Sequence, residues 1–82
     1  MKVEAKYLRH VTGQYSVAKV SYRPSVIGVY LDGVLMFTVT GRWVKDVAAD
    51  RYVNVPLTVE RSRWALIEWA KDEAVRRMTP AI

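Results

Sequence analysis

Cysteine is absent from this 82-residue sequence, which excludes disulfide bonds, thiolate catalysis and cysteine-ligated zinc. Histidine occurs once, at His10, and the acidic residues are scattered, so we expect neither a metal site nor a bound cofactor. Uninterrupted apolar runs, such as Val34 to Phe37, reach only four residues and are far too short to span a membrane. No charged-then-apolar segment with a small-residue cleavage site follows Met1, so we expect no signal peptide and a cytoplasmic location.

Motifs typical of common catalytic sites are missing as well. The four serines lie outside any G-x-S-x-G elbow, and no phosphate-binding or dinucleotide-binding glycine pattern occurs. Asp46 and Asp50 have the i,i+4 spacing of a carboxylate pair. Their neighbours Lys45 and Arg51 favour instead a solvated, charge-balanced loop. His10 lies in a basic stretch, which is more typical of a surface or edge position than of a general base. The sequence therefore predicts a protein that is not an enzyme.

The chain is rich in apolar residues and in positive charge. Its hydrophobic fraction of 51% excludes intrinsic disorder, and its length suits one small domain over residues 1–82. The formal net charge of +5 comes from 13 Lys and Arg against 8 Asp and Glu, and most of the excess lies in residues 1–31. This balance is typical of a protein with an anionic partner, and equally of a small domain kept soluble by its charge.

Turn signals divide most of the chain into short strands. Asp32-Gly33, between two apolar runs, is a strong signal for a two-residue hairpin, and Thr12-Gly13 marks another. Segment 43–51 is ambiguous, because it fits both a short helical turn and a prolonged strand. The expected strands are residues 2–11, 15–23, 26–31, 34–40 and 52–55.

The C-terminal segment has the apolar period of a helix. We expect this helix to begin after a Thr58 or Ser62 cap and to end at Thr79-Pro80. Its predicted core-facing stripe comprises Trp64, Leu66, Ile67, Ala70, Ala74, Val75 and Met78. The predicted fold class is therefore α+β: an antiparallel meander sheet of about five strands, which a strong curl could close, with one C-terminal amphipathic helix packed on one face.

Both faces of the central hairpin need cover, because neither of its strands alternates apolar with polar residues. With a regular register, one face carries Ile27, Val29, Leu31, Val34, Met36 and Thr38, and the other carries Val26, Gly28, Tyr30, Leu35, Phe37 and Val39. Gly28 would then lie opposite Phe37. The helix shields one face. The other could be covered by curling of the sheet into a small barrel, by a second copy in a homodimer, or by a different protein.

The basic N-terminal hairpin is a candidate nucleic-acid platform. In a two-residue-turn register, Lys6 would face Lys19 across the two strands, and Lys2 would face Arg23. Facing like charges destabilise a sheet, and a bound phosphate would remove that cost. Tyr15 on the same face adds an aromatic ring on which a base can stack. The alternative explanation is that these lysines protect an edge strand from aggregation.

Trp69 lies outside the predicted apolar stripe of the helix, among polar residues that include Glu73 and Arg76. A large aromatic ringed by charges is typical of a hot spot at a protein interface. The alternatives are that the helix is rotated or that segment 43–51 folds over Trp69. Exposure of Trp69 distinguishes these hypotheses.

Taken together, these features favour a non-enzymatic protein-binding module with a protein partner, contacted through Trp69, Glu73, Arg76, Tyr30 and Phe37. Small cysteine-free α+β chains without catalytic motifs are often inhibitors or adaptors that occlude a surface on a larger complex, including those that phages and other mobile elements direct against host machinery. This comparison rests on size and composition. The alternative is a nucleic-acid-binding protein that uses Lys2, Lys6, Tyr15, Lys19 and Arg23. A homodimeric structural component is a third hypothesis.

Overall fold

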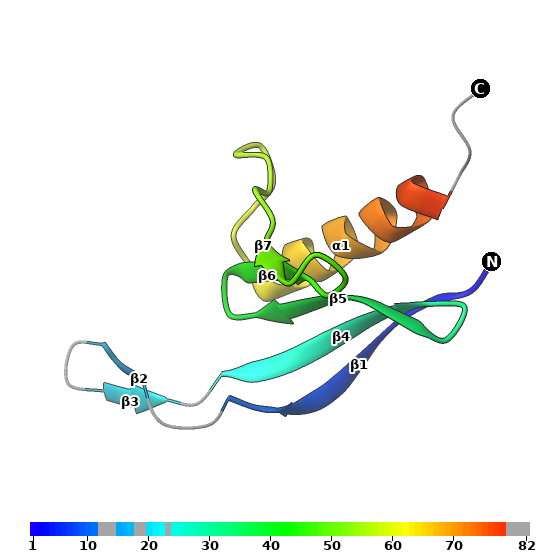
Figure 1. Ribbon diagram of the computed structural model, residues 1–82. Coiled ribbons are helices and arrows are strands. Elements are labelled where there is room, and N and C mark those ends of the chain that lie inside the picture. The colour runs from blue at the N-terminus through cyan, green and yellow to red at the C-terminus, as the bar shows by residue number, and fades with distance from the viewer. Residues whose placement is uncertain (12–14, 18–19, 23, 79–82) are drawn as a thin grey trace.

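The computed structural model describes residues 1–11, 15–17, 20–22 and 24–78 (Figure 1). Its elements are β1 (Val3–His10), β2 (Tyr15–Val17), β3 (Val20–Tyr22), β4 (Ser25–Leu31), β5 (Val34–Thr40), β6 (Trp43–Asp46), β7 (Arg51–Tyr52) and α1 (Arg63–Met78). Five strands form one antiparallel sheet in the order β1-β4-β5-β6-β7, while β2 and β3 form a separate two-stranded sheet. α1 packs on one face of the larger sheet. The predicted α+β class, with about five strands and one helix, is confirmed.

The turn between β4 and β5 forms at Asp32-Gly33, as predicted. Both residues have positive φ angles, 49° and 81°, which a type I′ turn requires. Asp32 also holds the start of β1: its backbone N–H donates to the Lys2 carbonyl and its Oδ1 accepts from the Lys2 N–H, both at 2.7 Å. At the other end, the Val11 N–H donates to the Pro24 carbonyl at 3.0 Å. β1 is therefore hydrogen-bonded to β4 along the whole length of β4.

β1 pairs with β4 and not with the described residues 15–17 and 20–22, so the predicted register of the N-terminal hairpin is wrong. In the observed register, Val3 and Ala5 pack against the core beneath α1. The three-residue strands β2 and β3 pair with each other and are too short to match that burial. Lys6 accordingly lies opposite Gly28 instead of Lys19, and Lys19 itself lies outside the described residues.

A β-bulge in β5 changes which side chains face the helix. The register is regular next to the turn, but Met36 is an additional residue, so that Phe37 pairs with Val29. This shift of one residue turns Phe37 into the core, where its exposed fraction is 0%. The predicted Gly28–Phe37 pair is therefore wrong, and Gly28 lies opposite Thr38. Because both strands are apolar on both faces, hydrophobic pattern alone did not specify the register beyond the turn.

The core lies between the sheet and α1. Its buried members are Val29, Leu31, Phe37, Val39 and Val44 from the sheet and Leu66, Ile67, Ala70 and Ala74 from the helix. The two alanines let the helix backbone approach the sheet closely. Ser62 caps the helix as predicted, because its Oγ accepts a hydrogen bond from the Ala65 N–H at 3.2 Å.

The helix is rotated relative to the predicted stripe. Trp64 and Met78, both expected in the core, are exposed, Trp64 by 71%. Trp69, expected on the polar side, is half-buried and packs against the core cluster with Val75. Among the weighed alternatives, the rotated helix is thus the one observed, and Trp69 is not a freely exposed aromatic.

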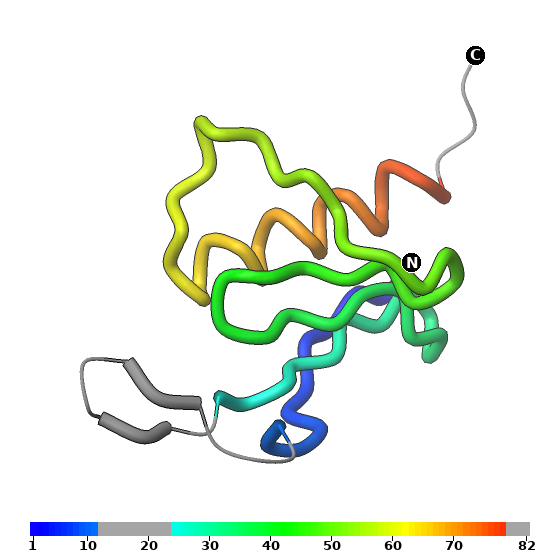
Figure 2. Tube along the Cα trace, turned by 60° about the vertical axis from the view of Figure 1, so that its left-hand side comes forward, coloured from blue at the N-terminus to red at the C-terminus, as the bar shows by residue number. Residues whose placement is uncertain are grey.

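Segment 43–51 continues the sheet as β6, turns at residues 47–50 and returns as β7, which is shorter than the strand expected at 52–55. A long connection then leads past the sheet to the start of α1 (Figure 2). The two edge strands of the sheet, β1 and β7, do not pair with each other, so the sheet is open and the barrel weighed as an alternative is wrong. Within the described part of the chain, no second layer covers the face opposite α1. No helix among these residues is both long and apolar enough to cross a membrane.

Candidate functional site

Two rows of side chains cross the helix-free face of the sheet. Residues paired across antiparallel strands point to the same face, so the observed registers define each row directly. The first row comprises Arg9, Val26, Thr40 and Trp43. The second row comprises Lys6, Gly28, Thr38, Lys45 and Tyr52. In both rows the residues on the central strands β4 and β5 are small, whereas β1, β6 and β7 contribute long cationic or aromatic side chains.

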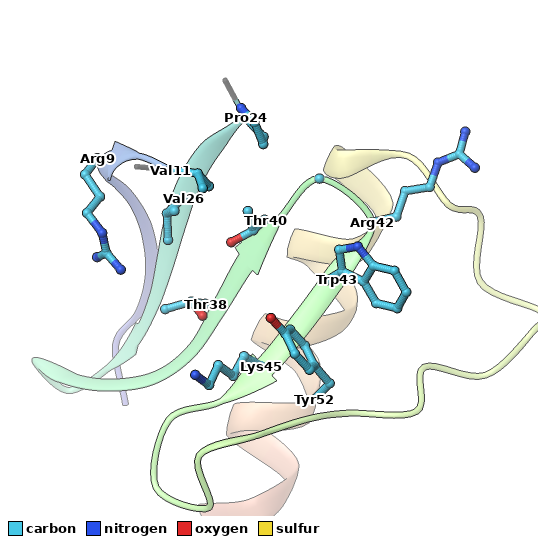
Figure 3. A pocket seen from close by; sticks show the side chains of 11 residues that line it. Arg9, Val11, Pro24, Val26, Thr38, Thr40, Arg42, Trp43, Lys45 and Tyr52 are labelled. Atoms are coloured by element: carbon cyan, nitrogen blue, oxygen red, sulfur yellow. The ribbon is translucent and has the colours of Figure 1, made fainter. Parts of the chain in front are cut away.

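This arrangement forms a trough with a cavity volume of about 760 Å³. Val26, Thr38 and Thr40 form its floor, while Arg9 stands on the β1 side (Figure 3). The opposite wall consists of Trp43, Lys45 and Tyr52 from β6 and β7. Val11, Pro24, Gly41 and Arg42 complete the lining. The helix lies behind the sheet in Figure 3, so the trough lies on the face opposite α1.

The aromatic wall is accessible from solvent. Trp43 and Tyr52 are exposed by 66% and 65%, and their ring centroids lie 5.9 Å apart in an edge-to-face arrangement. Lys45 Nζ lies 6.0 Å from the centroid of the Tyr52 ring. Two large exposed rings beside each other on a sheet surface are typical of a binding face rather than of a solvated one.

The cationic side chains that line the trough differ in whether a carboxylate forms an ion pair with them. Lys45 Nζ lies 3.0 Å from Oδ1 of Asp50, and its hydrogen bond to that carboxylate raises the pKa of Lys45 above its ordinary value. Neither Arg9 nor Arg42 takes part in an ion pair with any described residue. Arg42 points away from the trough, whereas Arg9 lies along its edge (Figure 3). Arg9 therefore supplies, opposite the aromatic wall, a positive charge that no described carboxylate neutralises.

The β1 end of the second row is more crowded. A Cβ at Gly28 would come within 2.9 Å of side-chain atoms of Leu8 and Tyr30, so these side chains fill the space above the glycine. Lys6 Nζ lies 5.4 Å from the Tyr30 ring centroid and 3.6 Å from Glu4, which also lies 3.8 Å from Lys2. The expected repulsion between Lys6 and a facing Lys19 does not arise in this register, because Lys6 lies opposite Gly28, and Glu4 lies near both Lys2 and Lys6.

The charged residues of α1 that were predicted to bind a protein partner, Glu73 and Arg76, make contacts within the chain. Glu73 Oε1 accepts hydrogen bonds from Arg76 at 2.6 Å and from Arg77 at 3.3 Å, and the first of these chiefly lowers the pKa of Glu73. Arg77 also donates to Asp46 Oδ2 at 2.5 Å and lies 4.8 Å from the Phe37 ring centroid. This network fastens the end of α1 to β6. Of the residues predicted for protein binding, Tyr30 alone lies on the helix-free face, and Phe37 is buried.

The side chains weighed as catalytic or metal-binding candidates lie apart from one another in the described part of the chain. His10 Nδ1 and the Tyr7 hydroxyl lie 2.7 Å apart on the exposed edge of the sheet. Asp46 and Asp50 point to different partners, and no cluster of metal-ligating side chains occurs in the described ranges. Asp46 and the Arg77 guanidinium form a tight pair, which, with a hydrogen bond from the Ala49 N–H, holds the pKa of Asp46 below its usual value.

The sequence did not predict Trp43, Lys45 and Tyr52 as site residues, but it did predict Lys6, which lies in the second row. Trp43 and Lys45 alternate with Val44, a period-two signal that would place both on one face had segment 43–46 been assigned as a strand. Of the residues predicted for nucleic-acid binding, Lys6 lies in the second row and Lys2 directly precedes β1. Lys19, Arg23 and the side chain of Tyr15 lie outside the described residues, in the segment that joins the trough residues Val11 and Pro24.

Comparison of the chain with protein-family models, curated proteins and solved structures finds no match. The chemistry of the trough is therefore the basis for inferring a function. A ligand that fits it carries negative charge on one side, toward Arg9, and a flat π-system on the other, toward Trp43 and Tyr52. The floor adds two hydroxyls, of Thr38 and Thr40, each able to donate and accept a hydrogen bond.

Proposed function

We propose that the protein is a non-enzymatic binding protein whose trough binds single-stranded nucleic acid. The observation that carries this proposal is the pairing of Arg9, which has no ion pair with a described residue, with two exposed aromatic rings across the helix-free face of the sheet. Proteins that bind single strands commonly combine cations for the backbone with aromatic side chains on which bases stack. The net charge of +5 adds long-range attraction for a polyanion.

Single strands suit the trough better than duplexes do. In a duplex the bases are stacked and paired, so their flat faces are not available to Trp43 and Tyr52. A single strand exposes phosphates and base faces together and can meet both walls at once. An acidic protein segment would satisfy Arg9 but would leave the aromatic wall without a specific partner.

The protein-binding module expected at Trp69 and Glu73 remains a prediction. Its proposed contacts are engaged in the packing of α1, so they offer less support than the trough does. The nucleic-acid function, by contrast, gains a surface that the sequence did not reveal. In this proposal the binding face moves from the N-terminal hairpin to the helix-free face, where Lys6 is the residue common to both.

The test is fluorescence anisotropy with fluorescein-labelled decathymidylate and a matched RNA over a series of salt concentrations. We expect Trp43→Ala to weaken binding by about 5- to 150-fold, because a stacked base contributes about 1–3 kcal/mol. Trp64→Ala is the matched control, since it removes an equally exposed tryptophan outside the trough. Arg9→Gln should lower the slope of log K against log salt by about 0.7, the value for one phosphate contact on a single strand. Arg63→Gln, at the start of α1, controls for net charge.

Two results would contradict binding of nucleic acid in the trough, and a third would contradict recognition of its bases. One is the lack of any salt-sensitive affinity of the wild type for DNA or RNA. The other is equal weakening by Trp43→Ala and Trp64→Ala, since the trough would then have no special part in binding. If heparin or polyglutamate binds as tightly as decathymidylate and Trp43→Ala leaves both unaffected, the surface recognises acidic polymers, a protein segment among them, and not bases.

A further inference from the structure

The spacing of the two rows determines how a strand can lie in the trough. On β4 the rows are represented by Val26 and Gly28, and on β5 by Thr40 and Thr38. Two residues along a strand correspond to about 6.8 Å, because each residue rises about 3.4 Å. In a stacked duplex each nucleotide of one strand rises about 3.4 Å along the axis. One nucleotide per row therefore requires a strand stretched to about twice its stacked rise.

A strand stretched in this way loses the stacking between neighbouring bases, and the aromatic wall can replace it. Trp43 stands at the end of the first row and Tyr52 at the end of the second. Their ring planes are inclined by 60°, so they cannot both lie parallel to the same stack of two bases. Each ring can instead receive one separate base. The geometry thus provides one ring for each nucleotide.

Each row also has its own cation and its own hydroxyl. The first row offers Arg9 and Thr40, and the second offers Lys45 and Thr38. All four side chains line the same trough. A threonine hydroxyl both donates and accepts, so it suits either the base edge or the sugar of any nucleotide and does not demand one sequence.

We infer that the trough consists of two adjacent nucleotide subsites, one per row, which hold an unstacked dinucleotide with one base on Trp43 and the next on Tyr52. This inference rests on the proposed function and deepens it, because it fixes the ligand as an extended single strand and its minimal unit as two nucleotides. Binding at the subsites is largely independent of sequence.

The experiment is competition against labelled decathymidylate by thymidine monophosphate, by 5′-phosphorylated dithymidylate and by two versions of that dinucleotide that lack either the 5′ or the 3′ base. We expect dithymidylate to compete at least about tenfold better than the monophosphate. Loss of either base should weaken competition by about 5- to 150-fold in the wild type. Trp43→Ala should abolish the response to one of the missing bases, and Tyr52→Ala should abolish the response to the other. Both side chains are largely exposed, so neither variant should impair folding.

The pattern across ligands and variants decides the inference. If each variant responds equally to both missing bases, the bases are not assigned to separate rows and the inference is wrong. It is also wrong if the monophosphate competes as well as the dinucleotide. In these cases decathymidylate still binds and the proposed function stands. A wild type that does not bind decathymidylate at all contradicts both. Trp64→Ala should reproduce the wild-type pattern throughout.

Discussion

Truncation of Phe37 and of Tyr30 tests the β-bulge, on which the assignment of the helix-free face depends. Because of the bulge, Phe37 is fully buried beneath α1, whereas Tyr30 lies half-exposed on the other face. In a regular hairpin both aromatic side chains would share one face. We expect Phe37→Ala to lower the free energy of unfolding by about 3–5 kcal/mol, as is typical of a buried phenylalanine. Tyr30→Ala should cost only about 1–2 kcal/mol, because only part of its surface is buried.

These costs are large relative to the stability of the chain. At about 0.05–0.15 kcal/mol per residue, a protein of this length has about 4–12 kcal/mol in total. Phe37→Leu, with a smaller loss in the same direction, keeps the comparison measurable if the alanine variant does not fold. The assay is urea unfolding followed by circular dichroism, with unchanged m values as the sign that only the native state was affected. Equal costs at Phe37 and Tyr30 would show that the two share a face and would refute the bulge.

Two further predictions concern the charged groups. The hydrogen bond from Arg77 lowers the pKa of Asp46 in the folded protein. The pair therefore stabilises the protein at pH values above the pKa of an unfolded aspartate, about 4, and this stabilisation is lost as the pH falls through the pKa of the folded state. Arg77→Gln should accordingly reduce the loss of thermal stability between neutral and acidic pH. Asp50→Asn should strengthen binding of decathymidylate and steepen its salt dependence by up to about 0.7, because it frees Lys45 for phosphate. Asparagine also tolerates the φ of 52° at this position, so an unchanged affinity would mean that Asp50 does not compete with the ligand.

The sequence predicted those elements that local signals define. Asp32-Gly33 formed its turn because few other residue pairs adopt two consecutive positive φ angles, and Ser62 capped α1 because its hydroxyl satisfies a free N–H of the first turn. The rotation of the helix escaped prediction. The apolar stripe on α1 is bounded by tryptophans on both sides, Trp64 and Trp69, and only the sheet beneath decides which of them is buried.

The trough could not be predicted, because it depends on pairings between distant segments. Arg9, Thr40 and Trp43 come together only once β1 has paired with β4 and β4 with β5 and β6. The sequence instead suggested that the first strand pairs with residues 15–23, which would have placed Lys6 beside Lys19. A local turn signal at Thr12-Gly13 does not reveal that a more apolar strand further along the chain is the better partner.

The bulge also explains why the sheet can leave the face opposite α1 without a second layer from the described residues. With a regular register that face would have carried Phe37 and Val39, and their exposure would have cost several kcal/mol at about 25 cal/mol per Å². The additional residue, Met36, moves both side chains beneath α1, where they are fully buried. The floor left behind includes Thr38 and Thr40, whose hydroxyls tolerate water. Large apolar surface remains chiefly at the aromatic wall, where a ligand that stacks would gain most from covering it. The ligand that we propose would cover the exposed rings of Trp43 and Tyr52 on this face.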